Sequence, residues 1–246
     1  MKTIPVFVLL VVCSVSTGIV RAAEKPQYAI LRTDRPLKID GKLDEPAWKN
    51  AKSVGPFKFA WWKQGKKEQT EAKLLWDDKY LYVSFRCEDE HISGTRTTRD
   101  SPVYRDDCVE VFTAPNPKHP LNYFNIEMNV RAAFLDQHHP EGPGVKLKNN
   151  WNATGVKIAV TIDGTLNNDN DTDRSWTLEA AIPFANFAKV ARNTPPHPGD
   201  VWHLNLNRLG GKTNPQYSQW SPSRTSRPQF HAPKDFGRVV FSKKTN

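Results

Sequence analysis

The sequence is poor in cysteine. Only three of its 246 residues are cysteines, and the first, Cys13, lies in an apolar N-terminal segment. Cys87 and Cys108 alone cannot form a four-ligand metal site. In an exported protein they could form a disulfide, whereas their places in strand-like runs fit two buried free thiols equally well. The pattern leaves both alternatives open.

The sequence also lacks the short motifs of common catalytic centres. It contains no Gly-x-Ser-x-Gly, no His-Glu-x-x-His and no phosphate-binding glycine loop. Carboxylate pairs such as Glu110 with Glu127 occur, but strands rich in acidic residues produce such pairs without any catalytic role. We therefore predict that the protein is not an enzyme, and a glycoside hydrolase acting on glycosidic bonds stays the enzymatic alternative.

Long apolar runs are absent beyond the N-terminus, so no membrane span is expected. Lys2 precedes the apolar run from Ile4 to Val12, and Ala22 supplies a small residue at a cleavage point, which is the pattern of a secretory signal peptide. We predict a signal peptide over residues 1–22 and a secreted or periplasmic protein. Residues 10–13 resemble a lipoprotein cleavage box, but the third of them is a bulky valine where a small residue is expected.

Dense positive charge is absent as well. The net charge of +9 falls to +7 without residues 1–22, which contain Lys2 and Arg21 and no acidic residue. The remaining charges are scattered, with no long basic run beyond Lys63 to Lys67, so nucleic-acid binding is not expected. A basic exported domain can instead meet an anionic polysaccharide or a negatively charged cell surface.

Apolar and aromatic residues are plentiful and strand-like in their pattern. The content of 38% hydrophobic and 11% aromatic residues indicates one well-packed domain over residues 23–246. From Glu71 onward apolar and polar residues alternate with the period of half-buried strands. Strands are expected at 71–76, 81–88, 107–113, 123–130, 132–136, 155–162, 175–182, 201–208, 217–220 and 237–241.

We therefore predict an all-β fold, a single antiparallel β-sandwich of immunoglobulin or jelly-roll type, with long loops and one or two short helices. Before Leu37 we expect only a polar leader. Asp44 is expected to cap a short helix that starts with Glu45 and Pro46 and turns Trp48 into the core.

Oxygen-bearing side chains alternate in one loop. Asp169, Asp171 and Asp173 suit a hard cation such as calcium, and we name them as candidate ligands of a structural calcium ion. The loop lacks the spacing and the terminal glutamate of an EF-hand. As a hairpin turn rich in Asn and Asp it needs no metal.

The stretch from Asp100 to Phe112 carries the first candidate for ligand binding. Tyr104 lies in a loop, and in the strand that follows Val109 and Val111 point one way while Glu110 points the other. An aromatic ring above a carboxylate suits a sugar, because sugars offer both C–H faces and hydroxyl groups.

Six motifs occur in one order along the chain. They are Ile39-Asp-Gly-Lys-Leu-Asp-Glu-Pro-Ala-Trp48, Leu75-Trp-Asp-Asp-Lys-Tyr-Leu-Tyr-Val83, Asp107-Cys-Val-Glu-Val-Phe112, Trp176-Thr-Leu-Glu-Ala-Ala-Ile-Pro183, Ser218-Gln-Trp-Ser221 and Phe236-Gly237. From Leu37 to Phe241 this order resembles carbohydrate-binding module family 9 and its relatives. The resemblance implies a β-sandwich that binds sugar without cleaving it, often attached to polysaccharide-degrading enzymes.

The resemblance also implies a binding site. It places two sugar-sandwiching aromatic rings at Tyr104 and Phe230 and a hydrogen-bonding carboxylate at Glu110. Three further positions fall on Asn125, Asn205 and Arg227, where amides can bond hydroxyl groups and a guanidinium favours a carboxylate or sulfate on the ligand.

We therefore predict an exported, non-catalytic protein that binds a saccharide or polysaccharide and assists glycan degradation beside glycan-degrading enzymes. A haem-binding periplasmic sandwich is the alternative of another class, with Met128 or a histidine as axial ligand. Trp61 and Trp62 are a second aromatic candidate, and one ring of this adjacent pair should face inward.

The signal pattern predicts a mature chain that begins near Ala23 or Glu24, because cleavage follows the small residue that ends the leader. N-terminal sequencing of secreted or periplasmic material checks this. Exported protein that still begins at Met1 would contradict the predicted cleavage.

Overall fold

The computed structural model describes residues 24–145, 147 and 151–243, so the predicted signal peptide lies outside the described residues. The described chain is almost entirely β-structure. Its strands are β1 (Gln27–Arg32), β2 (Thr70–Trp76), β3 (Tyr80–Glu88), β4 (Cys108–Ala114), β5 (Tyr123–Asn129), β6 (Phe134–His139), β7 (Lys157–Asp163), β8 (Ser175–Pro183), β9 (Val201–Leu209), β10 (Tyr217–Gln219) and β11 (Gly237–Ser242). The helices are α1 (Pro46–Asn50) and three single 3-10 turns, η1 (Val103–Arg105), η2 (Phe184–Phe187) and η3 (Pro233–Asp235).

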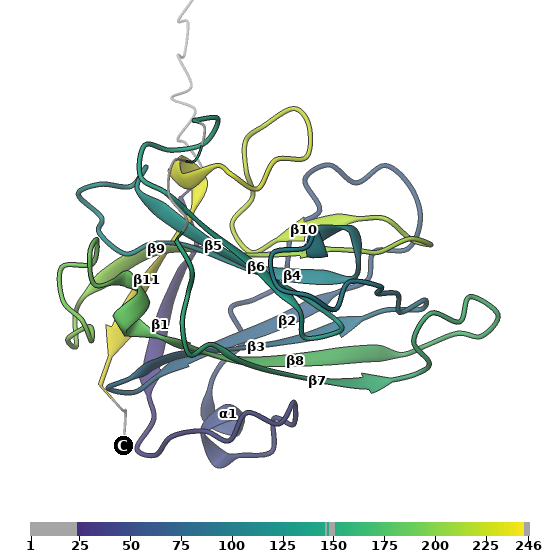
Figure 1. The fold of residues 1–246 in the computed structure, drawn as a ribbon, viewed down its shortest axis with the longest axis horizontal. Coiled ribbons are helices and arrows are strands. Elements are labelled where there is room, and N and C mark those ends of the chain that lie inside the picture. Colours follow the sequence, from purple (N-terminus) through teal and green to yellow (C-terminus); the bar gives the residue numbers. More distant parts are fainter. Residues whose placement is uncertain (1–23, 146, 148–150, 244–246) are drawn as a thin grey trace, which may run out of the picture.

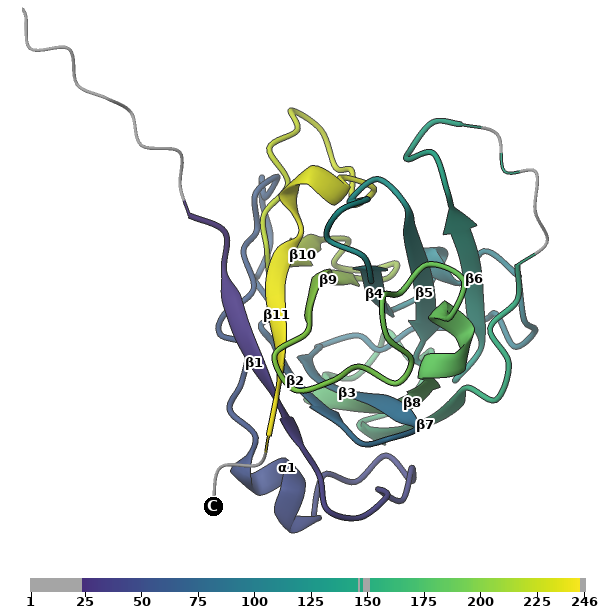
Figure 2. The same ribbon diagram turned by 90° about the vertical axis from the view of Figure 1, so that its left-hand side faces the viewer.

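One curled sheet forms both layers of a sandwich. The strand order is β6-β5-β4-β9-β11-β1-β2-β3-β8-β7, with β10 paired to β9. In Figure 1 strands β4, β5, β6, β9 and β10 form the upper layer, and β2, β3, β7 and β8 form the lower one. Strands β11 and β1 run along one side between the two layers (Figure 2). The predicted all-β sandwich is therefore confirmed.

Strand β1 departs from the sequence-based expectation. It lies in the segment taken as a polar leader, and Tyr28 and Ile30 alternate with more exposed residues and point into the core. It pairs in parallel with both β11 and β2, so the sheet is not purely antiparallel. This short strand joins the C-terminal strand to β2 and so closes one side of the sandwich.

The core lies between the layers because side chains alternate along every strand. From β4 and β5 the inward-facing residues are apolar, and they meet apolar residues of β3 and β8 in one buried cluster. Its members include Val83, Phe85, Val109, Val111, Ile126, Met128, Leu178, Ala180, Leu204 and Leu206. Each buried aliphatic or aromatic side chain contributes roughly 1.5–3 kcal/mol. Met128 is completely buried in this apolar cluster.

The first motif wraps over the outer face of the lower layer. Trp48 of α1 is completely buried and its Nε1 donates to Glu179 Oε1 at 2.9 Å. The other oxygen of Glu179 accepts the backbone N–H groups of Asp40 and Gly41, each at 3.1 Å. Gly41 has φ +79°, and a Cβ there would lie 3.0 Å from Thr161 Cγ2, so a glycine is needed at this turn.

The prediction that Asp44 caps α1 is wrong, because the cap is Glu45 and makes no side-chain cap bond.

The two cysteines are free thiols. Both Cys87 and Cys108 are completely buried and unbridged. Burial raises the pKa of the Cys87 thiol to about 12. Of the two alternatives from the sequence, the structure has the buried free thiols.

Glu179→Ala should lower the free energy of unfolding by about 2–4 kcal/mol, because it leaves an indole N–H and two backbone N–H groups without an acceptor. Denaturant unfolding followed by tryptophan fluorescence measures this. Glu71→Ala on β2, which removes an exposed carboxylate, is the control. Equal unfolding midpoints for the two variants would contradict the role given to Glu179.

Candidate functional site

The outer face of the upper layer carries a row of polar side chains. Glu110 on β4 pairs with Glu127 on β5 and with Asn207 on β9. The next outward-facing row contains Phe112, opposite Asn125 on β5 and Asn205 on β9. Polar side chains on an outer face are usually solvated, yet these two glutamates and three asparagines are buried, as is Phe112. Something must therefore cover this face.

The covering segments leave a cavity of about 410 Å³ above Glu110 and Glu127. Tyr104 from η1 and the segment that carries Phe230 and His231 form its walls. The described residues that line it are Tyr104, Glu110, Phe112, Glu127, Leu135, Gln137, Leu209, Tyr217, Pro228, Gln229, Phe230 and His231. A concave site with aromatic walls and a few convergent polar groups is typical of small-molecule binding.

The aromatic rings of this cavity differ in exposure. Tyr104 and Tyr217 are 43% and 40% exposed, so both side chains are accessible to a ligand. Phe230 is only 7% exposed and packs against Trp61, with ring centroids 5.7 Å apart, and edge-on against Tyr217 at 6.1 Å. Phe230 therefore forms a fixed wall, while the two tyrosines form the accessible rim.

The two carboxyl groups form the floor of the cavity. Asn207 Nδ2 donates to Glu110 Oε2 at 3.1 Å, and Asn125 Nδ2 donates to Glu127 Oε1 at 2.9 Å. Burial raises the pKa of Glu110 well above its usual range, and repulsion from Glu127 adds to the effect. Burial also raises the pKa of Glu127 to about 7. The pair therefore holds at least one proton near neutral pH.

Glu127 Oε2 is buried and finds no hydrogen-bond partner among the described residues. A buried polar atom without a partner is costly. Glu127 itself belongs to the lining of the cavity.

Two histidines next to the carboxyls are uncharged. His231 Nδ1 lies 2.8 Å from Tyr123 Oη, and His139 Nε2 lies 2.9 Å from Asn125 Oδ1. Burial lowers the pKa of each to about 4. Near neutral pH neither ring brings a positive charge to the cavity.

The structure brings three of the six predicted site residues together. Tyr104, Glu110 and Phe230 come from separate parts of the chain and line the same cavity. As expected for the pair of tryptophans, Trp61 packs inward on Phe230, while Trp62 is 42% exposed and stays outside the lining.

The other three predicted residues do not line the cavity. Asn125 lies one row away and bonds Glu127 and His139. Asn205 bonds the backbone of Ser221 through both ends of its amide, and so anchors the segment that leads to Phe230. Arg227 is exposed and lies outside the lining.

The assignment of site residues from the sequence did not use the register in which β4 pairs with β5 and β9. Glu127 and Asn207 are the direct cross-strand neighbours of Glu110, whereas Asn125 and Asn205 are their neighbours two positions away. The lining residues Gln137, Tyr217, Gln229 and His231 were also missed. Gln137 follows from the pairing of β5 with β6, but the other three come from β10 and a loop, where periodicity gives no guide.

The three aspartates named for calcium do not meet around one point. Asp173 accepts the backbone N–H groups of Ile92 and Thr165, and Asp171 accepts the hydroxyl of Thr165. Asp169 forms an ion pair with Lys212 at 2.9 Å. Over the described ranges no group of three or more His, Cys, Asp or Glu side chains is arranged to hold a metal ion. The calcium ligands stay a prediction from the sequence.

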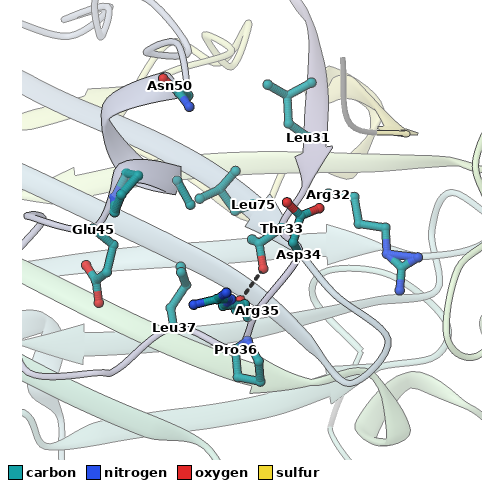
Figure 3. Close-up of a pocket in the computed structure, with 12 residues that line it drawn as sticks. Leu31, Arg32, Thr33, Asp34, Arg35, Pro36, Leu37, Glu45, Asn50 and Leu75 are labelled. Carbon is teal, nitrogen blue, oxygen red and sulfur yellow. Dashed lines mark hydrogen bonds between the residues drawn. The ribbon is translucent and has the colours of Figure 1, made fainter. Parts of the chain in front are cut away.

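A second cavity, of about 740 Å³, lies between α1 and the segment that follows β1. Figure 3 shows its lining, in which Thr33 Oγ1 bonds the carbonyl of Arg35. Arg32 is paired with Asp78 and lies over the ring of Trp76. No aromatic ring belongs to its described lining, so it offers no stacking surface for a sugar.

The chain was compared with protein families, with curated proteins and with solved structures. A family model described as carbohydrate family 9 binding domain-like matches residues 39–244. In the described part of the chain no helix is long and apolar enough to cross a membrane.

Solved structures share the fold. A Bacteroides uniformis protein, provisionally assigned as carbohydrate-binding, is 20% identical, with a TM-score of 0.74 over 89% of this chain and 100% of that one. A carbohydrate binding module family 9 of Caldicellulosiruptor kristjanssonii, in complex with cellotriose, is 15% identical, with a TM-score of 0.61 over 89% of this chain and 95% of that one. The same module in complex with glucose gives a TM-score of 0.60.

Two curated relatives are much longer than the matching segment. Endo-1,4-beta-xylanase A of Thermoanaerobacterium saccharolyticum is 28% identical over 150 residues, which are 61% of this chain and 11% of the xylanase. Exoglucanase XynX of Acetivibrio thermocellus is 25% identical over 149 residues, 61% of this chain and 12% of that protein. This chain therefore spans only a small part of the relatives it matches.

The raised pKa of Glu127 predicts a pH-dependent cost to stability. The pKa of a glutamate in an unfolded chain is about 4.3, whereas the pKa of Glu127 in the folded chain is about 7. The folded state therefore loses stability as pH rises between these values, and the loss is complete above the upper one. Glu127→Gln removes this loss, so its gain in stability over wild type should grow from pH 5 to pH 8.

Denaturant unfolding at the two pH values measures this gain, with Glu141→Gln, an exposed site, as control. A gain for Glu127→Gln that is the same at both pH values would contradict the raised pKa.

Proposed function

This chain belongs to the carbohydrate family 9 binding domain-like family, and we propose that it is an exported, non-catalytic protein that binds a saccharide in the cavity above Glu110 and Glu127. The binding domain starts at about residue 23, after the predicted signal peptide. The observation that supports this most is that Tyr104, Glu110 and Phe230, far apart in the sequence, line one cavity.

The chemistry of the lining suits a sugar ring. The exposed face of Tyr104 and the fixed wall of Phe230 offer apolar surfaces for the C–H faces of a pyranose. Glu110 and Glu127 on the floor, with the half-buried Gln137 beside them, offer acceptors and donors for hydroxyl groups. The family relatives bound to cellotriose and glucose add weight to a glucose-like ligand.

The placement of the carboxyls favours binding over cleavage. A glycosidase needs two carboxyl groups that flank the scissile bond. Glu110 and Glu127 are direct cross-strand neighbours on one floor, so both approach a ligand from the same side. The chain would then assist glycan degradation by holding a substrate near glycan-degrading enzymes. The similarity to segments of a xylanase and an exoglucanase supports that partnership.

Tyr104→Ala should weaken saccharide binding by about 1–3 kcal/mol, because it removes one stacking ring. Isolated sugar sites of this type bind with roughly millimolar to micromolar affinity, so this loss nearly abolishes measurable binding. Phe230→Ala should have a similar effect on binding. Glu110→Gln keeps the shape and one hydrogen bond and should weaken binding less.

Calorimetry with cellotriose, or with the best ligand from a glycan array, measures these changes on variants whose circular dichroism shows them folded. Trp62→Ala is the matched control, because Trp62 is an equally exposed aromatic residue outside the cavity lining. Wild-type affinity in Tyr104→Ala together with lost affinity in Trp62→Ala would move the site to the tryptophan.

A further inference from the structure

The cavity is acidic although the protein is basic. The chain has a net charge of +9, yet the described lining of this cavity contains two glutamates and neither lysine nor arginine. His231 in the lining and His139 behind it are held uncharged near neutral pH by burial, which lowers the pKa of each to about 4. Within the described lining, the carboxyl pair is therefore the group that can ionise against a positively charged ligand.

Among the described residues, no hydrogen bond or ion pair brings a cation to this carboxyl pair. The protein bonds to Glu110 and Glu127 come from the amides of Asn207 and Asn125, which are neutral donors. Glu127 is 5% exposed, and its Oε2 has no partner among the described residues. A positive group close to two such carboxyls favours their ionised form.

The rim of the cavity favours the same kind of ligand. Tyr104 and Tyr217 belong to its lining and are 43% and 40% exposed. The face of an aromatic ring carries negative potential and attracts an ammonium group. The rim and the floor of the cavity thus both favour a positively charged ligand. Arg227, which would favour an anionic ligand, lies outside the lining.

We propose that this site prefers a saccharide that carries a protonated amine, an amino sugar, over the equivalent neutral sugar. The preference rests on the proposed function, because it assumes that the cavity takes a saccharide at all. The ammonium group lies against the carboxyl groups of Glu110 and Glu127, while the ring stacks on Tyr104. N-acetylation removes the charge and adds bulk at the same atom, so it should abolish the preference.

The groups that face the carboxyl pair set what happens to its protons. They are each other, the neutral amides of Asn207 and Asn125, the phenols of Tyr104 and Tyr217, and the imidazole of His231. Since none of these is positive near neutral pH, an ammonium group is the cation that draws the pair into its ionised form. Binding an amino sugar should then release protons, and binding a neutral sugar should not.

Three trisaccharides with the same β-1,4 backbone test the preference on the full chain. They are the glucosamine trimer, its fully N-acetylated form and cellotriose, each titrated by calorimetry at about pH 6, below the pKa of Glu127. Repeating each titration in two buffers of different ionisation enthalpy counts the protons released. We expect the glucosamine trimer to bind at least about tenfold more tightly than either neutral trimer, a difference of about 1.4 kcal/mol, and to release protons.

Variants then assign the preference to the carboxyl pair. In Glu127→Gln and Glu110→Gln the ratio of the two affinities, glucosamine trimer over cellotriose, should fall toward one. Asp44→Asn, which changes an exposed acid two residues before α1 and outside the cavity lining, should leave the ratio unchanged.

The outcomes separate this preference from the proposed function. If cellotriose binds as tightly as the glucosamine trimer, the preference is overturned and the saccharide site stands. If none of the three trimers binds, the proposed function is overturned and the preference with it. If the preference persists in both glutamine variants, it does not arise from the carboxyl pair, and the inference is wrong.

Discussion

The guanidinium of Arg208 is completely buried between the layers, and much of the structure depends on how it is compensated. Its Nη2 lies 2.9 Å from Asp89 Oδ2, and its Nη1 donates to the carbonyl of Glu88 at 2.6 Å. Glu68 and Asp107 lie farther off, at 3.7 and 4.0 Å. Burial and repulsion from Asp89 raise the pKa of Asp107 to about 8, so this carboxyl keeps its proton and the buried charge is closer to balance. Removing one partner of such a buried pair costs roughly 3–5 kcal/mol.

This buried cation also fixes which side chains of β9 lie on the outer face of the upper layer. Arg208 belongs to β9, and its partners lie at the ends of β2 and β3, so the contact ties one layer to the other. Because side chains alternate, Arg208 pointing inward forces Asn207 to point outward onto Glu110. A slip of β9 by one residue would bury the amide among apolar side chains and expose the guanidinium on the cavity floor. The register that satisfies the buried charge is therefore the register that builds the acidic floor.

Features that depend on residues close together in the sequence could be predicted from it, whereas features that depend on the pairing of distant strands could not. Alternation along one strand is local, so the strands from β2 onward and the inward and outward faces of β4 were predictable. Tyr104, Glu110 and Phe230 followed from the resemblance in motif order and line one cavity. Strand β1 was missed because it is short and its two parallel partners are distant in sequence.

The other differences between the sequence-based expectations and the structure share a cause. Asn125 and Asn205 carry the right chemistry for a sugar site, but only the pairing of β4 with β5 and β9 shows that they lie one row from Glu110. Arg227 and the aspartates of the 169–173 loop lie in loops, where neither period nor register constrains a side chain. Asp44 was one residue too early because Pro46 sets the first turn of α1.

The central claim is that a saccharide binds on the floor formed by Glu110 and Glu127. The most direct measurement is an NMR titration of protein labelled with carbon-13 at its side-chain carboxyls, with increasing cellotriose. The carboxyl signals of Glu110 and Glu127 should shift together with saturation, while those of Glu68 and Glu179, which lie away from the cavity lining, should stay in place. Saturable binding that leaves the Glu110 and Glu127 signals unmoved would contradict the claim.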